Sequence, residues 1–153
     1  MKTIDTKAFL DTLCELAEKG ETVCTVVSGG SMLPFLSGGR DHVFLQKPVS
    51  RLKKGDIVLF TRKNGDYVLH RIKSADSKGY YLLGDRQTTP EGPVDESRIR
   101  CVAVKVRRKG KILSPNSFCW KFFSIVWIRT VFLRPAIFAM IGIFHKNNRK
   151  PKS

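Results

Sequence analysis

Short runs rich in β-branched and aromatic residues recur along the middle of this chain, each bounded by Gly, Pro, Asn or Asp. They occupy residues 22–28, 42–47, 56–62, 67–73, 80–83 and 99–107. This pattern is typical of a mostly antiparallel β domain. We therefore expect a mainly β domain over residues 21–114.

The clearest turn signal in this region is Asn64-Gly65. Asn-Gly favours the type I′ turn of a two-residue hairpin, which would place Leu59 opposite His70. The pleat then directs His70 inward, whereas Arg71 and Lys73 alternate to the other face, where we expect solvent.

Residues 1–20 predict a short amphipathic helix that stops at Gly20. Its apolar residues recur at helical spacing, namely Phe9, Leu10, Leu13, Leu16 and Ala17. The segment lacks the apolar region of a secretory signal, and it is too short for a helix-turn-helix domain. We expect neither an export signal nor a DNA-binding module here.

Residues 115–153 predict an apolar and basic helical segment. The stretch 118–144 is apolar but is interrupted by Lys121, Arg129, Arg134 and Pro135. Its apolar residues favour membrane insertion by about 4–8 kcal/mol, and Arg129 and Arg134 oppose it by about 5–7 kcal/mol. This balance favours an interfacial segment that associates with a membrane, on a side left open; the alternative is a pair of core helices broken at Pro135. Basic residues flank it: Arg107, Arg108, Lys109, Lys111, Lys146, Arg149, Lys150 and Lys152.

The charge of the chain points to a polyanionic partner. Lys and Arg number 28 against 13 Asp and Glu, a formal net charge of +15. Nucleic acid and an anionic membrane both fit this charge; we expect the membrane surface and no specific nucleic acid. No metal or cofactor is expected, because Cys14, Cys24, Cys101 and Cys119 show no zinc-like spacing and no phosphate or dinucleotide motif occurs.

Candidate chemistry begins at Ser28-Gly29-Gly30-Ser31-Met32-Leu33-Pro34, where the backbone can bend closely around a substrate carbonyl. A serine in such a loop is more often part of an ordinary turn, so composition alone does not decide. Further segments follow in order: Lys54-Gly55-Asp56-Ile57-Val58, His70-Arg71-Ile72, Leu83-Gly84-Asp85 and Asp95-Glu96-Ser97-Arg98.

In this order and spacing, these segments resemble the signal peptidase I family over residues 26–106 or so. The resemblance implies a signal-peptidase-like β catalytic domain with Ser31 as nucleophile and His70 as general base, as in the archaeal and endoplasmic-reticulum enzymes and some bacterial ones. An imidazole suits that role near neutral pH. The resemblance also makes Asp85 and Asp95 candidates for orienting His70, with Glu96 possible because residues 88–93 lengthen this stretch.

Two departures from the family pattern stand out. Gly29 replaces a serine that often helps bind the oxyanion, so the backbone amide of Ser31 should do so, assisted by Ser28. Gly30, Met32 and Pro34 would border the substrate. Members usually begin with a transmembrane helix, whereas the apolar region here is at the other end.

We therefore expect a serine endopeptidase that removes signal or leader peptides from a peptide or preprotein, cleaving after Ala-x-Ala patterns as the family does. One alternative is a cytoplasmic-face leader peptidase for small secreted or modified peptides. Another is a non-catalytic basic β module that binds RNA or lipid. A LexA-like self-cleaving regulator is disfavoured, because it calls for lysine at position 70 and a DNA-binding domain in place of the short helix.

Overall fold

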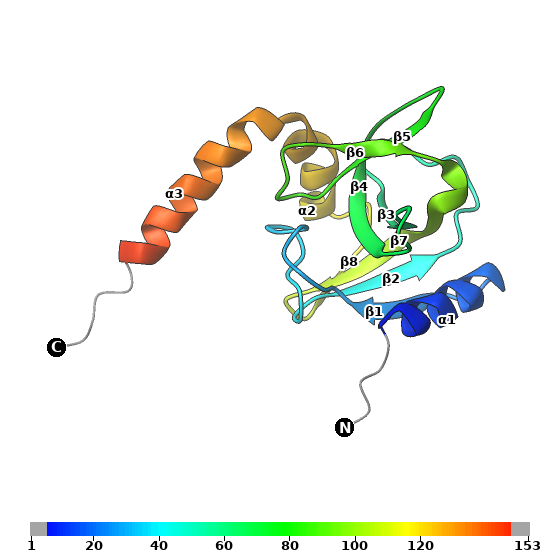
Figure 1. The fold of residues 1–153 in the computed structure, drawn as a ribbon. Coiled ribbons are helices and arrows are strands. Elements are labelled where there is room, and N and C mark those ends of the chain that lie inside the picture. Colours follow the sequence, from blue (N-terminus) through cyan, green and yellow to red (C-terminus); the bar gives the residue numbers. More distant parts are fainter. Residues whose placement is uncertain (1–5, 148–153) are drawn as a thin grey trace.

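The computed structural model describes residues 6–147 and confirms a mainly antiparallel β fold with one short helix before the sheet. The helix α1 (Thr6–Glu18) lies beside β1 and β2, and the C-terminal helix α3 extends away from the β domain (Figure 1). The strands are β1 (Val23–Val26), β2 (His42–Gln46), β3 (Ile57–Thr61), β4 (Tyr67–Asp76), β5 (Gly79–Leu83), β6 (Glu91–Val94), β7 (Ile99–Arg108) and β8 (Lys111–Leu113).

All strand pairs are antiparallel, in the order β1-β2-β7-β3-β4-β5-β6, with β8 on β7. Two apolar clusters form the core. The first holds Leu45 and Leu59 of the sheet together with Cys14 and Ala17 of α1 and with the C-terminal aromatic residues. The second surrounds Phe60 and includes Val58, Ile72, Leu82 and Val94.

Two strands are additional to the six expected from the sequence. β6 contains Pro93, which argues against a strand, but β6 forms an edge of the sheet, where a missing N–H donor is tolerated. β8 follows the two-residue turn Lys109-Gly110, whose φ angles of 50° and 79° are both positive, as a type I′ turn requires.

The hairpin between β3 and β4 differs from the expected type. Arg62 accepts a hydrogen bond from Gly65 N and donates to Asp66 O, both at 2.9 Å, and Gly65 has a φ of 91°. The loop therefore has three residues, a type I turn with a glycine bulge. The predicted register was wrong by one residue, because Val58 and not Leu59 faces His70. His70 is nevertheless buried, as predicted.

The predicted exposure of Arg71 was also wrong. Arg71 is fully buried, and Lys73 is half-buried and donates to Ile128 O. The C-terminal segment supplies partners on this side of β4, so the strand is covered on both faces and alternation no longer separates core from solvent.

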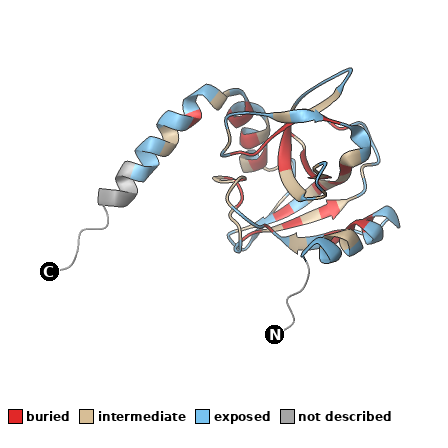
Figure 2. Ribbon diagram, in the orientation of Figure 1, coloured by how far each residue is buried: buried red, intermediate tan, exposed pale blue. Residues whose placement is uncertain are grey.

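The C-terminal segment has a packed half and a projecting half. Helix α2 (Phe118–Lys121) and the turns to Arg129 bury Trp120, Phe123 and Trp127, whereas α3 (Arg134–Asn147) is largely exposed (Figure 2). The break lies at Thr130, not at Pro135, because Pro135 occupies the first turn of α3, where no backbone donor is needed.

Among the described residues, no single helix has the length and hydropathy to cross a bilayer. The segments Phe118–Arg129 and Val131–Gly142 have the required length and hydropathy only when taken together, and the angle between them is 83°. Of the predicted basic flank, Arg149, Lys150 and Lys152 lie outside the described residues.

Candidate active site

Ser31 lies in the loop between β1 and β2, and buried contacts fix the shape of this loop. Asp41 is fully buried and accepts hydrogen bonds from the backbone N–H groups of Ser37 at 2.8 Å and Lys109 at 3.0 Å. A Cβ at Gly38 would lie 2.3 Å from the carbonyl oxygen of Gly29. The two sides of the loop can therefore come this close only because residue 38 is a glycine. The nucleophile candidate thus sits on a constrained loop and is itself half-buried.

The turn after β5 contacts Ser31 from a second direction. Arg86 N donates to Ser31 O at 2.9 Å, and a Cβ at Gly84 would lie 2.5 Å from the same oxygen. Gly84 N in turn donates to Gln87 Oε1 at 3.1 Å. The position of Ser31 therefore depends on the turn Gly84 to Gln87.

His70 lies on β4 with 1% of its surface exposed, and its ring is 5.8 Å from that of Phe60 between centroids. Within residues 6–147, its Nδ1 atom has no hydrogen-bond partner. Burial, aided by the positive charge of Arg62, lowers the pKa of His70 to about 4. The imidazole is therefore neutral at physiological pH and can accept a proton.

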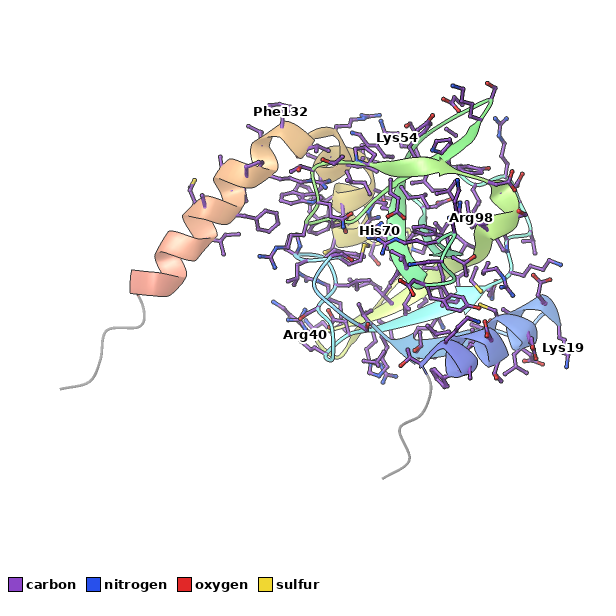
Figure 3. All side chains as sticks on the ribbon, viewed as in Figure 1. Lys19, Arg40, Lys54, His70, Arg98 and Phe132 are labelled. Carbon is purple, nitrogen blue, oxygen red and sulfur yellow. The ribbon has the colours of Figure 1, made fainter. Side chains whose placement is uncertain are left out.

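Ser31 and His70 border the same cavity, whose volume is about 570 Å³. Ser28 and Met32, also predicted from the sequence, line it as well, whereas Gly30 and Pro34 are not among its described lining residues. Figure 3 shows His70 in the interior of the β domain. No hydrogen bond joins Ser31 to His70 in the described part of the chain. This is compatible with a catalytic role, because catalytic hydrogen bonds are often long in substrate-free enzymes.

Asp85 is buried, but its hydrogen-bond partner is Arg71 and not His70. Its two carboxylate oxygens accept from Nε and Nη2 of Arg71, each at 2.9 Å. The remaining nitrogen of Arg71 donates to Gly55 O at 2.9 Å and to Ser124 Oγ at 3.0 Å. The structure therefore places Asp85 on Arg71 and not on His70.

Asp95 has a local role in the backbone. It caps the short helix Glu96–Arg98 and accepts from Ser97 N at 2.9 Å and from Ser97 Oγ at 2.6 Å. Asp95 and Glu96 are exposed. Neither Asp85 nor Asp95 is hydrogen-bonded to His70 among residues 6–147, so an orienting role for either one stays a prediction.

The C-terminal segment holds the turn that contacts Ser31. Arg134 Nη1 donates to Gly84 O at 3.0 Å and to Gln87 O at 2.6 Å, and Trp127 Nε1 donates to Asp85 O at 2.7 Å. Arg134 Nη2 also donates to Trp127 O at 3.1 Å. This role of Arg134 was not predicted from the sequence, although a cation inside an apolar run was the available signal.

Comparison with known proteins supports a serine-type peptidase in general. The model of the Peptidase S24-like family matches residues 2–106, which is more than half of the chain. Comparisons with curated proteins and with solved structures give no match. The family match does not single out signal peptidase I, and the family also includes the self-cleaving LexA type, which the histidine at position 70 and the short N-terminal helix disfavour. The chain belongs to the Peptidase S24-like family of serine-type peptidases.

Proposed function

We propose that this protein is a membrane-associated serine endopeptidase that removes signal or leader peptides, with Ser31 as nucleophile and His70 as general base. The observation that carries the proposal is that a constrained serine and a buried neutral histidine border one cavity. The alternative of a non-catalytic β module gives no reason for this pairing.

In the proposed reaction, Ser31 Oγ attacks the scissile carbonyl carbon while its proton passes to His70. The carbonyl oxygen gains the negative charge beside the backbone amide of Ser31, with Ser28 at the same cavity. The tetrahedral intermediate collapses, and His70 returns the proton to the leaving amine. Water then attacks the acyl-serine while His70 accepts its proton. The bond from the acyl carbon to Ser31 Oγ breaks, and His70 returns the proton to Oγ.

The acidic limit of this activity follows from the burial of His70. Because the pKa of His70 is lowered to about 4, the base stays unprotonated well below pH 6.5. We expect the rate at which a fluorophosphonate labels Ser31 to fall as the pH drops through about 4. A fall centred near pH 6.5 would mean that His70 is solvated or is not the base.

The activity test uses the full chain, its Ser31→Ala and His70→Gln variants, and Ser50→Ala as the control for an exposed serine. Each is incubated with a peptide library that contains Ala-x-Ala leaders, and new termini are mapped by mass spectrometry. We expect cleavage by the wild type and by Ser50→Ala only. Turnover by purified Ser31→Ala would remove Ser31 from the mechanism.

The same preparations test self-cleavage, which the family match makes a specific second candidate. An intramolecular reaction would produce new termini within the wild-type chain, absent from Ser31→Ala, at a rate independent of protein concentration. Cleavage of added peptides with an intact wild-type chain supports the proposed endopeptidase instead.

We propose that membrane association occurs through the C-terminal segment. Phe118 and Phe132 are 87% and 78% exposed, and the cations Lys121 and Arg129 lie exposed between them. Such a mixture suits an anionic interface. We expect sedimentation with anionic vesicles that weakens in Phe132→Asp and in high salt, and no binding by the wild type would exclude this localisation. Fractionation with protease protection would then distinguish a cytoplasmic-face peptidase from one that acts outside.

A further inference from the structure

The cavity beside Ser31 has a buried apolar floor. Its floor residues belong to the first core cluster and are at most 5% exposed: Val27, Met32, Val43, Leu45 and Leu59. Phe9 and Leu10 of α1, Val26 of β1 and Leu69 of β4 line it as well. Phe9 and Val26 remain exposed at 43% and 45%, so they offer apolar surface that nothing in residues 6–147 fully covers.

The size of the cavity exceeds what a small side chain can fill. Its volume of about 570 Å³ is within the range of small-molecule pockets, which is roughly 300–1,000 Å³. An apolar cavity of about 150 Å³ is already large enough for benzene. The single methyl group of an alanine would leave most of this apolar lining against water, whereas a larger aliphatic or aromatic group would cover it.

The charges at the cavity select against a cationic side chain. The ionisable residues that line it are Arg62, Tyr67 and His70, and no Asp or Glu is among its described lining residues. Arg62 pairs with Glu91 at 2.9 Å, and the chain as a whole carries a net charge of +15. A lysine of the substrate would meet no carboxylate among these lining residues and would lose part of its hydration.

We propose that this cavity is the main specificity pocket and that it takes a bulky uncharged side chain, such as Leu, Met or Phe, of an extended peptide. The inference rests on the proposed function, since it assumes that Ser31 attacks the bound peptide. It replaces the Ala-x-Ala preference expected from the family resemblance. Alternate side chains of an extended peptide share a face, so the pocket accepts the attacked residue or the one two positions before it.

The test measures how fast peptidyl diphenyl phosphonates label Ser31, and it requires no knowledge of the natural substrate. Ser31 Oγ attacks the phosphorus, phenoxide leaves, and the serine proton passes to His70. One probe series carries Ala, Leu, Phe or Lys at the attacked residue, and a second varies the residue two positions before it. In at least one of the two series, the Leu or Phe probe should label Ser31 at least about tenfold faster than the Ala probe. The Lys probe of that series should label it more slowly than the Ala probe.

Pocket-filling variants sharpen the test. Val26→Trp on β1 and Leu10→Trp on α1 should bring the Leu-to-Ala ratio close to one, and Val49→Trp is the matched control, because Val49 is 91% exposed and outside the cavity. Thermal unfolding verifies that each variant is folded, and the wild-type ratio decides by itself if one is not.

The outcomes separate the two proposals. Ser31 labelled equally fast or faster by the Ala probes in both series overturns the bulky-residue pocket and leaves the peptidase assignment intact. A wild-type chain whose Ser31 reacts with no probe overturns the peptidase assignment, and the pocket assignment with it.

Discussion

Two adjacent buried residues of strand β4 differ in whether their side-chain nitrogens have hydrogen-bond partners. On one face, Arg71 has partners for Nε, Nη1 and Nη2, including both oxygens of Asp85. On the other face, the adjacent His70 has an Nδ1 atom with no partner in residues 6–147 and borders a cavity. Buried polar groups are normally satisfied. In residues 6–147 the buried side-chain nitrogens without a partner are His42 Nδ1, His70 Nδ1 and Arg134 Nε, and of these three residues only His70 lines the cavity, so His70 is where chemistry is expected.

The hydrogen bonds on the Arg71 side continue into the C-terminal segment, where Arg134 Nε is a buried atom without a partner in residues 6–147. We define the Arg71 network as Arg71, Asp85, Ser124, Trp127 and Arg134, whose hydrogen bonds connect β4, the turn after β5 and the C-terminal helices. Since this turn also contacts Ser31, we expect the network to act on the proposed active site by positioning Ser31 and not by proton transfer.

Breaking the buried ion pair should have the largest effect. Asp85→Asn leaves the Arg71 guanidinium without its counter-charge, and Arg71→Met leaves a buried carboxylate, so either should lower the free energy of unfolding by about 3–5 kcal/mol. Urea denaturation at pH 7 measures this loss. The double variant Arg71→Met/Asp85→Leu should recover much of it. If Asp85 instead orients His70, Asp85→Asn should retain stability and shift the pH dependence of Ser31 labelling.

The buried His70 should make the stability of the folded protein fall in acid. The pKa of His70 is about 4 in the folded state against 6.5 for a free histidine. Below pH 6.5 His70 therefore binds a proton in the unfolded chain but not in the folded chain. The free energy of unfolding falls with the pH until the pH reaches the folded-state pKa of about 4. The total loss is on the order of 3 kcal/mol.

His70→Gln tests this assignment, because it removes the titrating group. Relative to the wild type, this variant should lose less stability between pH 7 and pH 4.5 in urea denaturation. His42→Gln is the control, since it removes a histidine that does not line the cavity. An unchanged acid dependence in His70→Gln would locate the sensitive group elsewhere.

The difference between the faces also explains what the sequence could predict. Local patterns identified α1, six strands and the inward direction of His70, because periodicity and turn residues are local properties. They did not identify the partners of Arg71, since Gly55, Asp85 and Ser124 are distant in the sequence. The hairpin register was missed for a subtler reason: Asn-Gly fits both a two-residue turn and the three-residue loop that formed.

Arg134 should matter less for stability than Arg71, although both are buried. Removing Arg134 leaves only the carbonyl oxygens of Gly84, Gln87 and Trp127 without their donor, and no buried anion. We expect Arg134→Met to lower the free energy of unfolding by roughly 1–3 kcal/mol. Labelling of Ser31 should slow as well, because the turn that contacts Ser31 is released.

Arg129→Met provides the matched control, since Arg129 is an exposed cation of the same segment. It should leave both stability and labelling near wild-type values. Equal effects of the two substitutions would show that the charge of the segment, and not the hydrogen bonds of Arg134, is what matters.

The smallest expected effect comes from removing a single hydrogen bond, which joins Trp127 of the C-terminal segment to the turn after β5. Trp127 and Trp120 are 6% and 4% exposed in the same cluster, but only the indole N–H of Trp127 has a described partner, Asp85 O at 2.7 Å. Phenylalanine at either position removes similar apolar area, so the difference between Trp127→Phe and Trp120→Phe reports mainly this bond. We expect Trp127→Phe to be less stable by about 1 kcal/mol and to label more slowly at Ser31. If the two variants label equally fast, the bond to Asp85 O stabilises the fold without positioning the nucleophile. The influence of the C-terminal segment on Ser31 would then have to pass through its other contacts with this turn, which are the hydrogen bonds of Arg134 and the contact of Phe138 with Arg86.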